Sequence, residues 1–345
     1  MEPQQITSEW LSDVMGGPVQ ITAEQRIGDG LVGMNMRYSL LVPADAGLPP
    51  SIIAKLPSPD PTSRATGIAL RNYEREVKFY EQIAPTVDIR VAKCWFSEWD
   101  EATGDFTLLL EDLSPAEQGN QITGCSAELA RRSVLELARL HGPRWGDSTL
   151  DDIEFLSRRS GAEDASQLQV LWTMMLPGFL ATYAKYLDQE GIELVERFGA
   201  RLPDWVNNRT LPLTVTHGDY RLDNLMFGTD RGGYPVSAVD WQTPGHGPAS
   251  ADVSYFMGAG PLPEVRREIE RGVVDAYIDA LAGYGVAVDR AEFWREYCRD
   301  AYGGVIMAVI ASQIVGGTER SEAMFAAMAT RHVRHALDVD AESLI

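Results

Sequence analysis

Three oxygen-bearing side chains follow one another within a short stretch of this chain. Asp219 comes directly after a β-branched run, Asn224 stands five residues later, and Asp240 follows a second apolar run. A carboxylate in the first position can accept the proton of a substrate hydroxyl, and an amide and a second carboxylate can share a hard cation such as Mg²⁺. This order of groups suits a protein that holds a magnesium–nucleotide complex beside a hydroxyl group.

Short strands are predicted to carry these three side chains. Residues 213–216 lead into the first, and residues 225–228 and 236–239 flank a glycine-containing turn that predicts a β-hairpin. Because a hairpin returns the chain to its starting point, the other two side chains are predicted to lie side by side. Each residue alone is as well explained by a turn or a cap, and only their joint order favours the chemical interpretation. His217 is predicted to be structural, bound to backbone carbonyls of its loop.

Three glycines, Gly28, Gly30 and Gly33, match the pattern G-x-G-x-x-G. A dinucleotide-binding fold would need a helix directly after this loop and an acidic residue about twenty positions later. Residues 34–40 instead alternate between apolar and polar, which predicts a strand, and the only acid between Gly33 and Leu56 is Asp45. Strand–loop–strand is therefore predicted, an arrangement in which backbone amides cover phosphates. A plain hairpin turn is the alternative for this motif.

Lys55 lies within the short apolar run 51–56, which is predicted to be a strand. A buried lysine is rare unless it pairs or binds an anion, and the alternative is an edge strand that lets the side chain reach solvent. Residues 64–83 follow with a helical pattern. The neighbours of Glu76 at helical spacing are nearly all apolar, whereas those of Glu74 are mostly polar. Glu76 is therefore predicted to pair with Lys55 and to hold its ammonium group for phosphate binding.

The composition excludes several classes of protein. The formal net charge of −20 argues against binding to the phosphate backbone of nucleic acids. The N-terminus lacks the basic and apolar segments of a signal peptide, and the three scattered cysteines, Cys94, Cys125 and Cys298, suit a reducing cytoplasm. The apolar run at 301–317 is interrupted by glycines and polar residues, so a buried helix is predicted there and a membrane span is not.

A chain of 345 residues exceeds one ordinary core, so two lobes are predicted. Residues 1–112 read as strand-rich with one helix, and residues 113–345 read as mostly helical with a small cluster of strands. Helices are predicted at 127–141 and 265–284, where the apolar residues recur at helical spacing.

A further helix is predicted at 168–187, with a break at Pro177–Gly178. Its methionines and aromatic residues suit an adaptable apolar surface for an acceptor molecule. A plain core helix is the alternative. The preferred acceptor is a bulky, partly hydrophobic alcohol over a polycationic sugar, and an antibiotic is a further candidate.

Taken together, these motifs resemble those of the aminoglycoside-phosphotransferase-like superfamily, particularly the branch with choline kinase and the ecdysteroid-kinase-like enzymes. The resemblance covers residues 20–260, and its most specific parts are the His-Gly-Asp…Asn and Asp-Trp-Gln motifs. The matching pieces stand in the family's order: Lys55, 76–80, 110–113, Leu140-His141 with Trp145, 217–224, and 240–242 with Asp252.

This resemblance implies an α+β, two-lobed protein-kinase-like fold, with an antiparallel sheet and one helix in the small N-lobe and a mostly helical C-lobe. It implies that ATP lies between the lobes and that its adenine binds backbone groups near Glu111 and Leu113. GTP stays open, because backbone contacts dominate the choice of base. The implied partner is a small molecule with a hydroxyl group, which receives the γ-phosphate.

The resemblance also implies roles for single residues. Asp219 would be the catalytic base, Asn224 and Asp240 would bind Mg²⁺, and Asp252 would support the catalytic loop from below. The main alternative is a non-catalytic nucleotide-binding scaffold, although such a pseudokinase would normally have lost one of these residues or Lys55. A protein kinase is disfavoured, because His-Gly-Asp replaces His-Arg-Asp and no Ala-Pro-Glu segment follows. The identity of the acceptor and the oligomeric state stay open.

Overall fold

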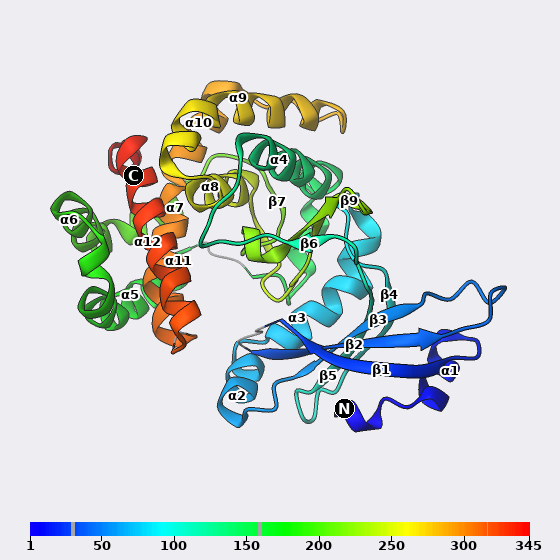
Figure 1. Cartoon of the computed structure of the whole chain (residues 1–345). Helices are drawn as coiled ribbons and strands as arrows, with labels where there is room; N and C mark the ends of the chain where they lie inside the picture. The colour runs from blue at the N-terminus through cyan, green and yellow to red at the C-terminus, as the bar shows by residue number, and fades with distance from the viewer. Residues whose placement is uncertain (29–31, 158–160, 316) are drawn as a thin grey trace. The chain divides into compact units, whose positions relative to one another are not determined.

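The computed structural model describes residues 1–28, 32–157, 161–315 and 317–345 (Figure 1). The chain forms two compact units. Unit 1 consists of Met1–Thr86, Arg90–Ala116 and Gly228–Pro244. Unit 2 consists of the remaining segments, Val87–Ile89, Glu117–Phe227 and Gly245–Ile345. The predicted lobes, 1–112 and 113–345, were each continuous in sequence, whereas unit 1 also takes in a late segment. That the two units act as nucleotide-binding and catalytic lobes stays a prediction.

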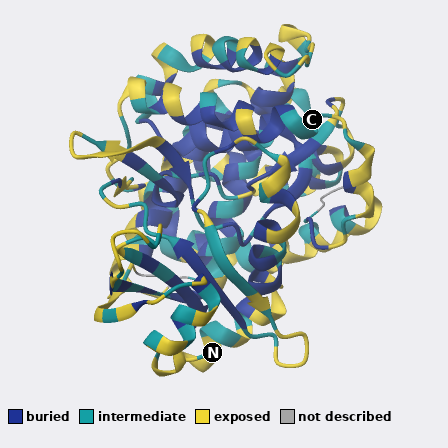
Figure 2. Ribbon diagram, turned by 90° about the vertical axis from the view of Figure 1, so that its right-hand side faces the viewer, coloured by how far each residue is buried: buried dark blue, intermediate teal, exposed yellow. Residues whose placement is uncertain are grey.

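The centre of unit 1 is a five-stranded antiparallel sheet in the order β1-β2-β3-β5-β4. The strands predicted at 34–40 and 51–56 are both present in it. β1 at the edge is mostly exposed, whereas β3 and β5 in the interior are mostly buried (Figure 2). The strand bounds are β1 Gln20–Ile27, β2 Gly33–Leu41, β3 Ser51–Pro57, β4 Cys94–Trp99 and β5 Phe106–Glu111.

The prediction of one helix at 64–83 was wrong, because the chain turns at Leu70 and Arg71. Arg71 has φ 58, and a Cβ on Gly67 would lie 2.6 Å from the ring of Tyr73, so the two helices pack closely at this glycine. The spacing of apolar residues within one segment cannot predict tertiary packing of this kind. The helices of unit 1 are α1 Ser8–Met15, α2 Pro61–Ala69, α3 Asn72–Lys78, a π-helical turn at Phe79–Ile83, and short 3₁₀ turns at Pro3–Gln5 and Ala84–Thr86.

The remaining strands are short. In unit 2, β7 (Leu213–Thr216) pairs with β10 (Gly245–Pro248), and β6 (Glu117–Gln118) pairs with the start of β8 (Leu225–Thr229). The turn of the predicted hairpin lies in unit 1, where β8 ends and β9 (Gly232–Ala238) begins. All three strands predicted at 213–216, 225–228 and 236–239 are therefore present, with shifted ends for the last two.

Helices make up most of unit 2. The helix predicted at 127–141 has the expected ends, but the predicted break at Pro177–Gly178 was wrong, because Pro177 lies inside a continuous α5. A Cβ on Gly178 would lie 2.3 Å from Oε1 of Gln313 in α11, so close packing holds the helix together there. The helices are α4 Ala127–His141, α5 Ala162–Tyr183, α6 Gln189–Phe198, α7 Leu202–Asn207, α8 Ala249–Ala259, α9 Pro263–Ala282, α10 Arg290–Arg299, α11 Ala301–Ile314 and α12 Glu319–Asp338. Short 3₁₀ turns lie at Gly142–Arg144, Ser148–Asp152, Ala184–Tyr186, Gly199–Arg201, Leu222–Asn224 and Ala341–Leu344.

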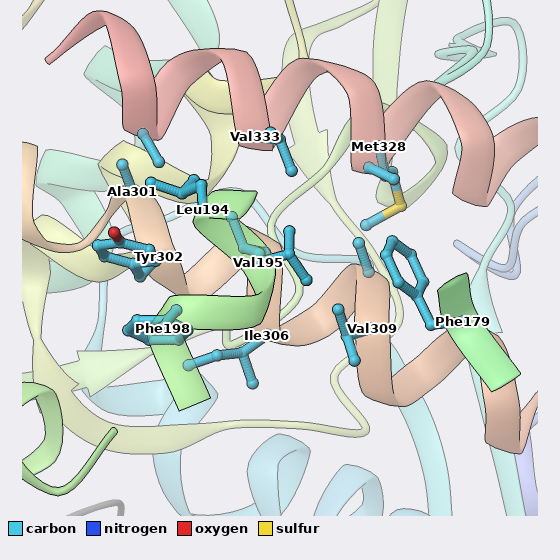
Figure 3. Packing of buried hydrophobic residues seen from close by; sticks show 14 of the residues in the cluster. Phe179, Leu194, Val195, Phe198, Ala301, Tyr302, Ile306, Val309, Met328 and Val333 are labelled. Carbon is cyan, nitrogen blue, oxygen red and sulfur yellow. The ribbon is translucent and has the colours of Figure 1, made fainter. Parts of the chain in front are cut away.

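The core of unit 2 gathers α5, α6, α11 and α12 around aromatic side chains (Figure 3). Phe198 and Tyr302 stack with ring centroids 3.8 Å apart, and Phe179 of α5 is fully buried in the same cluster. Residues 301–314 of the predicted apolar run form the largely buried helix α11, as predicted for that part of the run. Among the residues described, none of the helices combines the length and the apolar character that crossing a membrane requires.

Candidate active site

Lys55 is the centre of a charged network in unit 1. It lies in β3 between Asn35 of β2 and Leu108 of β5, so the edge-strand alternative does not apply. Its Nζ lies 2.7 Å from both carboxylate oxygens of Glu76 and 2.7 Å from Oδ1 of Asp240. The predicted pair of lysine and glutamate is thus present. We call Lys55, Glu76 and Asp240 the Lys55 network.

Burial and charge act in opposite directions within this network. Burial by itself would lower the pKa of Lys55, but Asp240 and Glu76 outweigh it and raise that pKa on balance. Burial raises the pKa of Glu76, and the ammonium group of Lys55 and a hydrogen bond with Gln242 only partly oppose this. The lysine therefore stays a cation and is held between two carboxylates.

Asp240 has an unusual backbone conformation. Its φ of 64 lies in the left-handed region, which costs a non-glycine residue roughly 1 kcal/mol or more and often marks a functional site. The next residue, Trp241, is fully buried and stacks on Phe79 with ring centroids 3.8 Å apart. Trp241 thus packs behind the site, whereas the side chain of Asp240 is 39% exposed. Because Trp241 is anchored in this way, the backbone position from which the Asp240 side chain extends is fixed.

The glycine loop joins two antiparallel strands. Gly28 has φ 68 and follows β1, and Gly33 begins β2. A Cβ on Gly33 would lie 3.4 Å from the carbonyl oxygen of Leu56 and 3.8 Å from Cε of Lys55. Gly30 lies outside the described residues. The two strands that flank the motif are present and pair antiparallel, and the role of these glycines in phosphate binding stays a prediction.

Glu111 and Leu113 lie at the end of β5 and in the segment after it. The carboxylate of Glu111 pairs with Arg90 at 2.6 Å, and its backbone N–H donates to the carbonyl of Lys93 at 2.8 Å. The carbonyl of Leu113 accepts a hydrogen bond from the N–H of Ala116 at 3.0 Å. These bonds shape the segment, and its contact with a nucleotide base stays a prediction.

Asp219 lies in unit 2, in the loop that follows β7. Its Oδ1 accepts a hydrogen bond from the hydroxyl of Tyr255 at 2.7 Å. Its Oδ2 accepts from Nδ2 of Asn224 at 2.9 Å and from Nε of Arg221 at 3.1 Å. The carboxylate is 21% exposed, so it is held on several sides and still reaches solvent.

Asp252 of α8 supports this loop from behind. It accepts hydrogen bonds from the backbone N–H groups of His217 at 2.6 Å and Gly218 at 3.0 Å, and it lies 3.3 Å from Nε2 of His141. Burial alone would raise the pKa of Asp252, but His141 and the His217 backbone lower it on balance. His217 in turn accepts the backbone N–H of Asp219 through Nδ1 at 3.3 Å. These contacts hold the backbone of the loop.

Asn224 ends a 3₁₀ turn, and β8 begins at the next residue, where the predicted strand at 225–228 also begins. Its Nδ2 donates to both the backbone oxygen and Oδ2 of Asp219. With the amide nitrogen used in this way, the amide oxygen is the atom that can serve a cation. An amide oxygen and a carboxylate are ligands that Mg²⁺ accepts, so Asn224 and Asp240 fit the predicted metal site in their chemistry. That the two meet at one ion stays a prediction.

Helix α5, which contains most of the segment predicted as an acceptor surface, has one buried face and one exposed face. Trp172, Phe179 and Tyr183 of α5 are buried in the core of unit 2. Val170 and Met174 on its other face are 56% and 65% exposed. The aromatic residues therefore serve the core, and the exposed apolar side chains are the ones open to a ligand.

Sequence reasoning missed three residues around the 217–224 loop. Arg221 and Tyr255 both contact Asp219, and Gln121 accepts the N–H of Leu222 through its side chain at 2.9 Å. Tyr255 stands three positions after Asp252 on one helix, a spacing that could have pointed to it. Gln121 lies about a hundred positions from the loop, and its sequence context carries no comparable signal.

Comparison with known proteins identifies the family and the fold of this chain. The model of the ecdysteroid kinase-like family matches residues 48–285, which is more than half of the chain. None of the curated protein sequences matches it. Solved structures are similar in fold along nearly the whole length, as the resemblance in the motifs predicted.

Three of these structures illustrate the fold. A protein of Ralstonia eutropha JMP134, provisionally named an aminoglycoside phosphotransferase, has a TM-score of 0.55 and 15% identity and covers 96% of this chain and 97% of its own. The ternary complex of APH(2″)-IIa with streptomycin and ATP has a TM-score of 0.51 and 13% identity, with 94% and 98% covered. Plasmodium vivax ethanolamine kinase has a TM-score of 0.51 and 10% identity, with 94% and 84% covered. On the match to its family model, the chain belongs to the ecdysteroid kinase-like family.

Proposed function

We propose that this protein is an ATP-dependent phosphotransferase that moves the γ-phosphate of ATP to a hydroxyl group of a small molecule. The observation that carries the proposal is the carboxylate of Asp219, held by Tyr255, Asn224 and Arg221 and still partly exposed. Membership of a kinase-like family supports the same class of reaction. A base held in this way can accept a hydroxyl proton during transfer.

The chain's own groups have separate tasks in this proposal. Asp219 orients the acceptor hydroxyl and takes its proton, and Lys55 binds the α- and β-phosphates. Asn224 and Asp240 would hold the magnesium ion, which supplies neutralisation of the phosphate charge when it is bound. Gly28, Gly30 and Gly33 would cover the phosphates, and adenine would bind near Glu111 and Leu113. GTP is the alternative nucleotide.

The acceptor is proposed to be a bulky, partly hydrophobic alcohol or an antibiotic with a free hydroxyl group. The exposed Val170 and Met174 of α5 support an apolar contact with it. We place the reaction in the cytoplasm, where the free thiols of Cys94, Cys125 and Cys298 would stay reduced.

A library of alcohols and antibiotics tests the activity. The protein is incubated with each compound and Mg-ATP, and mass spectrometry detects an added phosphoryl group. We expect product with the wild type and far less product with Asp219→Ala in the same time. Nucleotide binding in a thermal-shift assay without transfer to any compound would favour the non-catalytic scaffold instead. Labelling of mixed proteins from radioactive ATP would favour a protein kinase.

A crystal structure with Mg²⁺ and a non-hydrolysable ATP analogue tests the arrangement. The proposal requires the amide oxygen of Asn224 and the carboxylate of Asp240 to flank one cation on the phosphates. A structure in which the two side chains are far apart or face away from the nucleotide would contradict it.

A further inference from the structure

Helix α8 presents two side chains to the 217–224 loop, one turn apart. Asp252 holds the backbone N–H groups of the loop, whereas Tyr255, three positions later, holds the side chain of Asp219. The hydroxyl of Tyr255 donates to Oδ1 of Asp219 at 2.7 Å, and the tyrosine is 5% exposed. The backbone and the carboxylate of the loop are thus positioned by the same helix.

The ring of Tyr255 is fixed from behind. It stacks on the imidazole of His332 in α12 with ring centroids 5.1 Å apart and planes 18° apart. His332 is fully buried, and a Cβ on Gly304 of α11 would lie 1.9 Å from its Nδ1. Because nothing larger than glycine fits there, His332 and the tyrosine above it have little room to move.

The hydrogen bonds of Asp219 distinguish its two oxygens. A carboxylate has about four acceptor directions, two on each oxygen. Within the described part of the chain, Oδ2 already accepts from Asn224 and Arg221, and Oδ1 accepts from Tyr255 alone. The acceptor direction that is left therefore lies on Oδ1, beside the phenol.

We propose that Tyr255 is a positioning residue that presents Oδ1 of Asp219 as the atom that accepts the hydroxyl proton, an inference that rests on the proposed phosphotransferase function. In that step the O–H bond of the acceptor breaks and its proton goes to Oδ1. The acceptor oxygen forms a bond to the γ-phosphorus. The bond from that phosphorus to the bridging oxygen breaks, and the nucleoside diphosphate leaves with the electron pair.

Tyr255→Phe removes the hydroxyl and keeps the ring on His332. Without its donor, Oδ1 is no longer held in one orientation, so we expect kcat to fall roughly 10-fold, the size of one hydrogen bond to a charged group. The KM for ATP should change less than about 2-fold, because the phenol touches the base and the ATP-binding lysine lies in another network. A KM rise with unchanged kcat would overturn the proposal.

A matched control is Tyr297→Phe. Tyr297 is likewise a buried tyrosine whose hydroxyl donates to a carboxylate, Oε2 of Glu270 at 3.1 Å, but its partner lies outside the 217–224 loop. We expect this variant to keep wild-type kcat. Equal losses of kcat in the two variants would mean that Tyr255 acts only through packing, which contradicts the proposal.

Two double-mutant cycles complete the test. In the Asp219→Asn background, the further change Tyr255→Phe should leave the residual kcat unchanged, because the group through which it acts is already altered. The same four proteins are compared by thermal unfolding, where the shifts in Tm should be non-additive. The unfolding cycle needs no enzymatic activity. If the protein transfers phosphate to no acceptor, the proposed function is refuted, but the unfolding cycle still tests the hydrogen bond between Tyr255 and Asp219. Additive effects in both cycles would refute the role of Tyr255.

Discussion

The Lys55 network in unit 1 and the surroundings of Asp219 in unit 2 are built in opposite ways. The first sets one buried cation between two carboxylates that come from segments far apart in the sequence. The second sets one carboxylate among three donors, two of which, Arg221 and Asn224, lie in its own loop. The first is one cation shared by two anions, and the second is one anion that accepts hydrogen bonds from two neutral donors and from the cation Arg221.

The difference bears on what each network must do when a ligand binds. Lys55 already has two anionic partners, so a phosphate would have to compete with Asp240 for its ammonium group. Asp219 keeps one acceptor direction on Oδ1, so a hydroxyl could bind there without displacing a partner. We infer that the Lys55 network rearranges on nucleotide binding, whereas the base is preorganised.

The largest expected effect separates chemistry from binding. Asp219→Ala should lower kcat at least about 100-fold, because general-base help is lost. Its affinity for nucleotide should stay within about 2-fold of the wild type, because the base contacts the acceptor. Steady-state kinetics and nucleotide titration measure the two quantities. Unchanged turnover would remove Asp219 from the mechanism and end the contrast between the two networks.

The next largest expected effect concerns Asp252, which holds the backbone of the loop that carries Asp219. Asp252→Ala should lower the free energy of unfolding by about 3 kcal/mol, because it leaves buried N–H groups and His141 without their acceptor. Urea unfolding measures it. Asp279→Ala is the control, because that carboxylate is 68% exposed and its pair with Arg290 on the surface should contribute little to stability. Equal losses in the two variants would mean that Asp252 is not a support of the loop.

Lys55→Ala tests the opposite side of the comparison. We expect the Kd for ATP to rise roughly 10- to 100-fold, because a charged hydrogen bond to phosphate is lost and the carboxylates of Glu76 and Asp240 remain. Isothermal titration measures the change. Lys78→Ala is the control, because Lys78 pairs with Glu74, which is not part of the Lys55 network, and the variant should bind ATP normally. Wild-type affinity in Lys55→Ala would show that the network is structural.

The smallest expected effect is a loss of stability at acidic pH. Burial first, and then Arg331 and Arg266, lower the pKa of His332 from 6.5 to about 3. Above pH 6.5 the imidazole is neutral in both states and adds no pH dependence. Below it the unfolded chain takes up a proton that the folded protein refuses, so stability should fall by about 1.4 kcal/mol per pH unit until about pH 3.

His332→Phe keeps a flat ring under Tyr255 and removes this titration. Urea unfolding at pH 7 and pH 5.5 should show a smaller acid loss for the variant than for the wild type. The loss should not vanish, because burial also lowers the pKa of His335. Equal losses would mean that His332 takes up a proton in the folded protein. The packing around His332 and Tyr255 would then be more open to water than we infer.

Much of the local structure could be predicted from the sequence. β7 and α4 have the predicted ends. The apolar neighbours of Glu76 correctly predicted that it faces inward and pairs with Lys55. The failures lie where packing overrides propensity. Arg71 divides a segment that reads as one helix, and Pro177 continues a helix that it was predicted to break. In both places a glycine, Gly67 or Gly178, lets another segment approach closely, and a periodicity read along one window contains no information about that segment.

The order Asp219, Asn224, Asp240 and the pairing of Lys55 with Glu76 were readable in the sequence, because spacing within a loop and a face on one helix are local properties. Only the tertiary structure decided that Asp240 adopts a left-handed backbone beside Lys55, and that Tyr255 and not another donor meets Oδ1 of Asp219. Those contacts depend on how distant segments pack. Many sequences with the same spacing could have supplied a different donor, so the choice is made by packing and not by pattern.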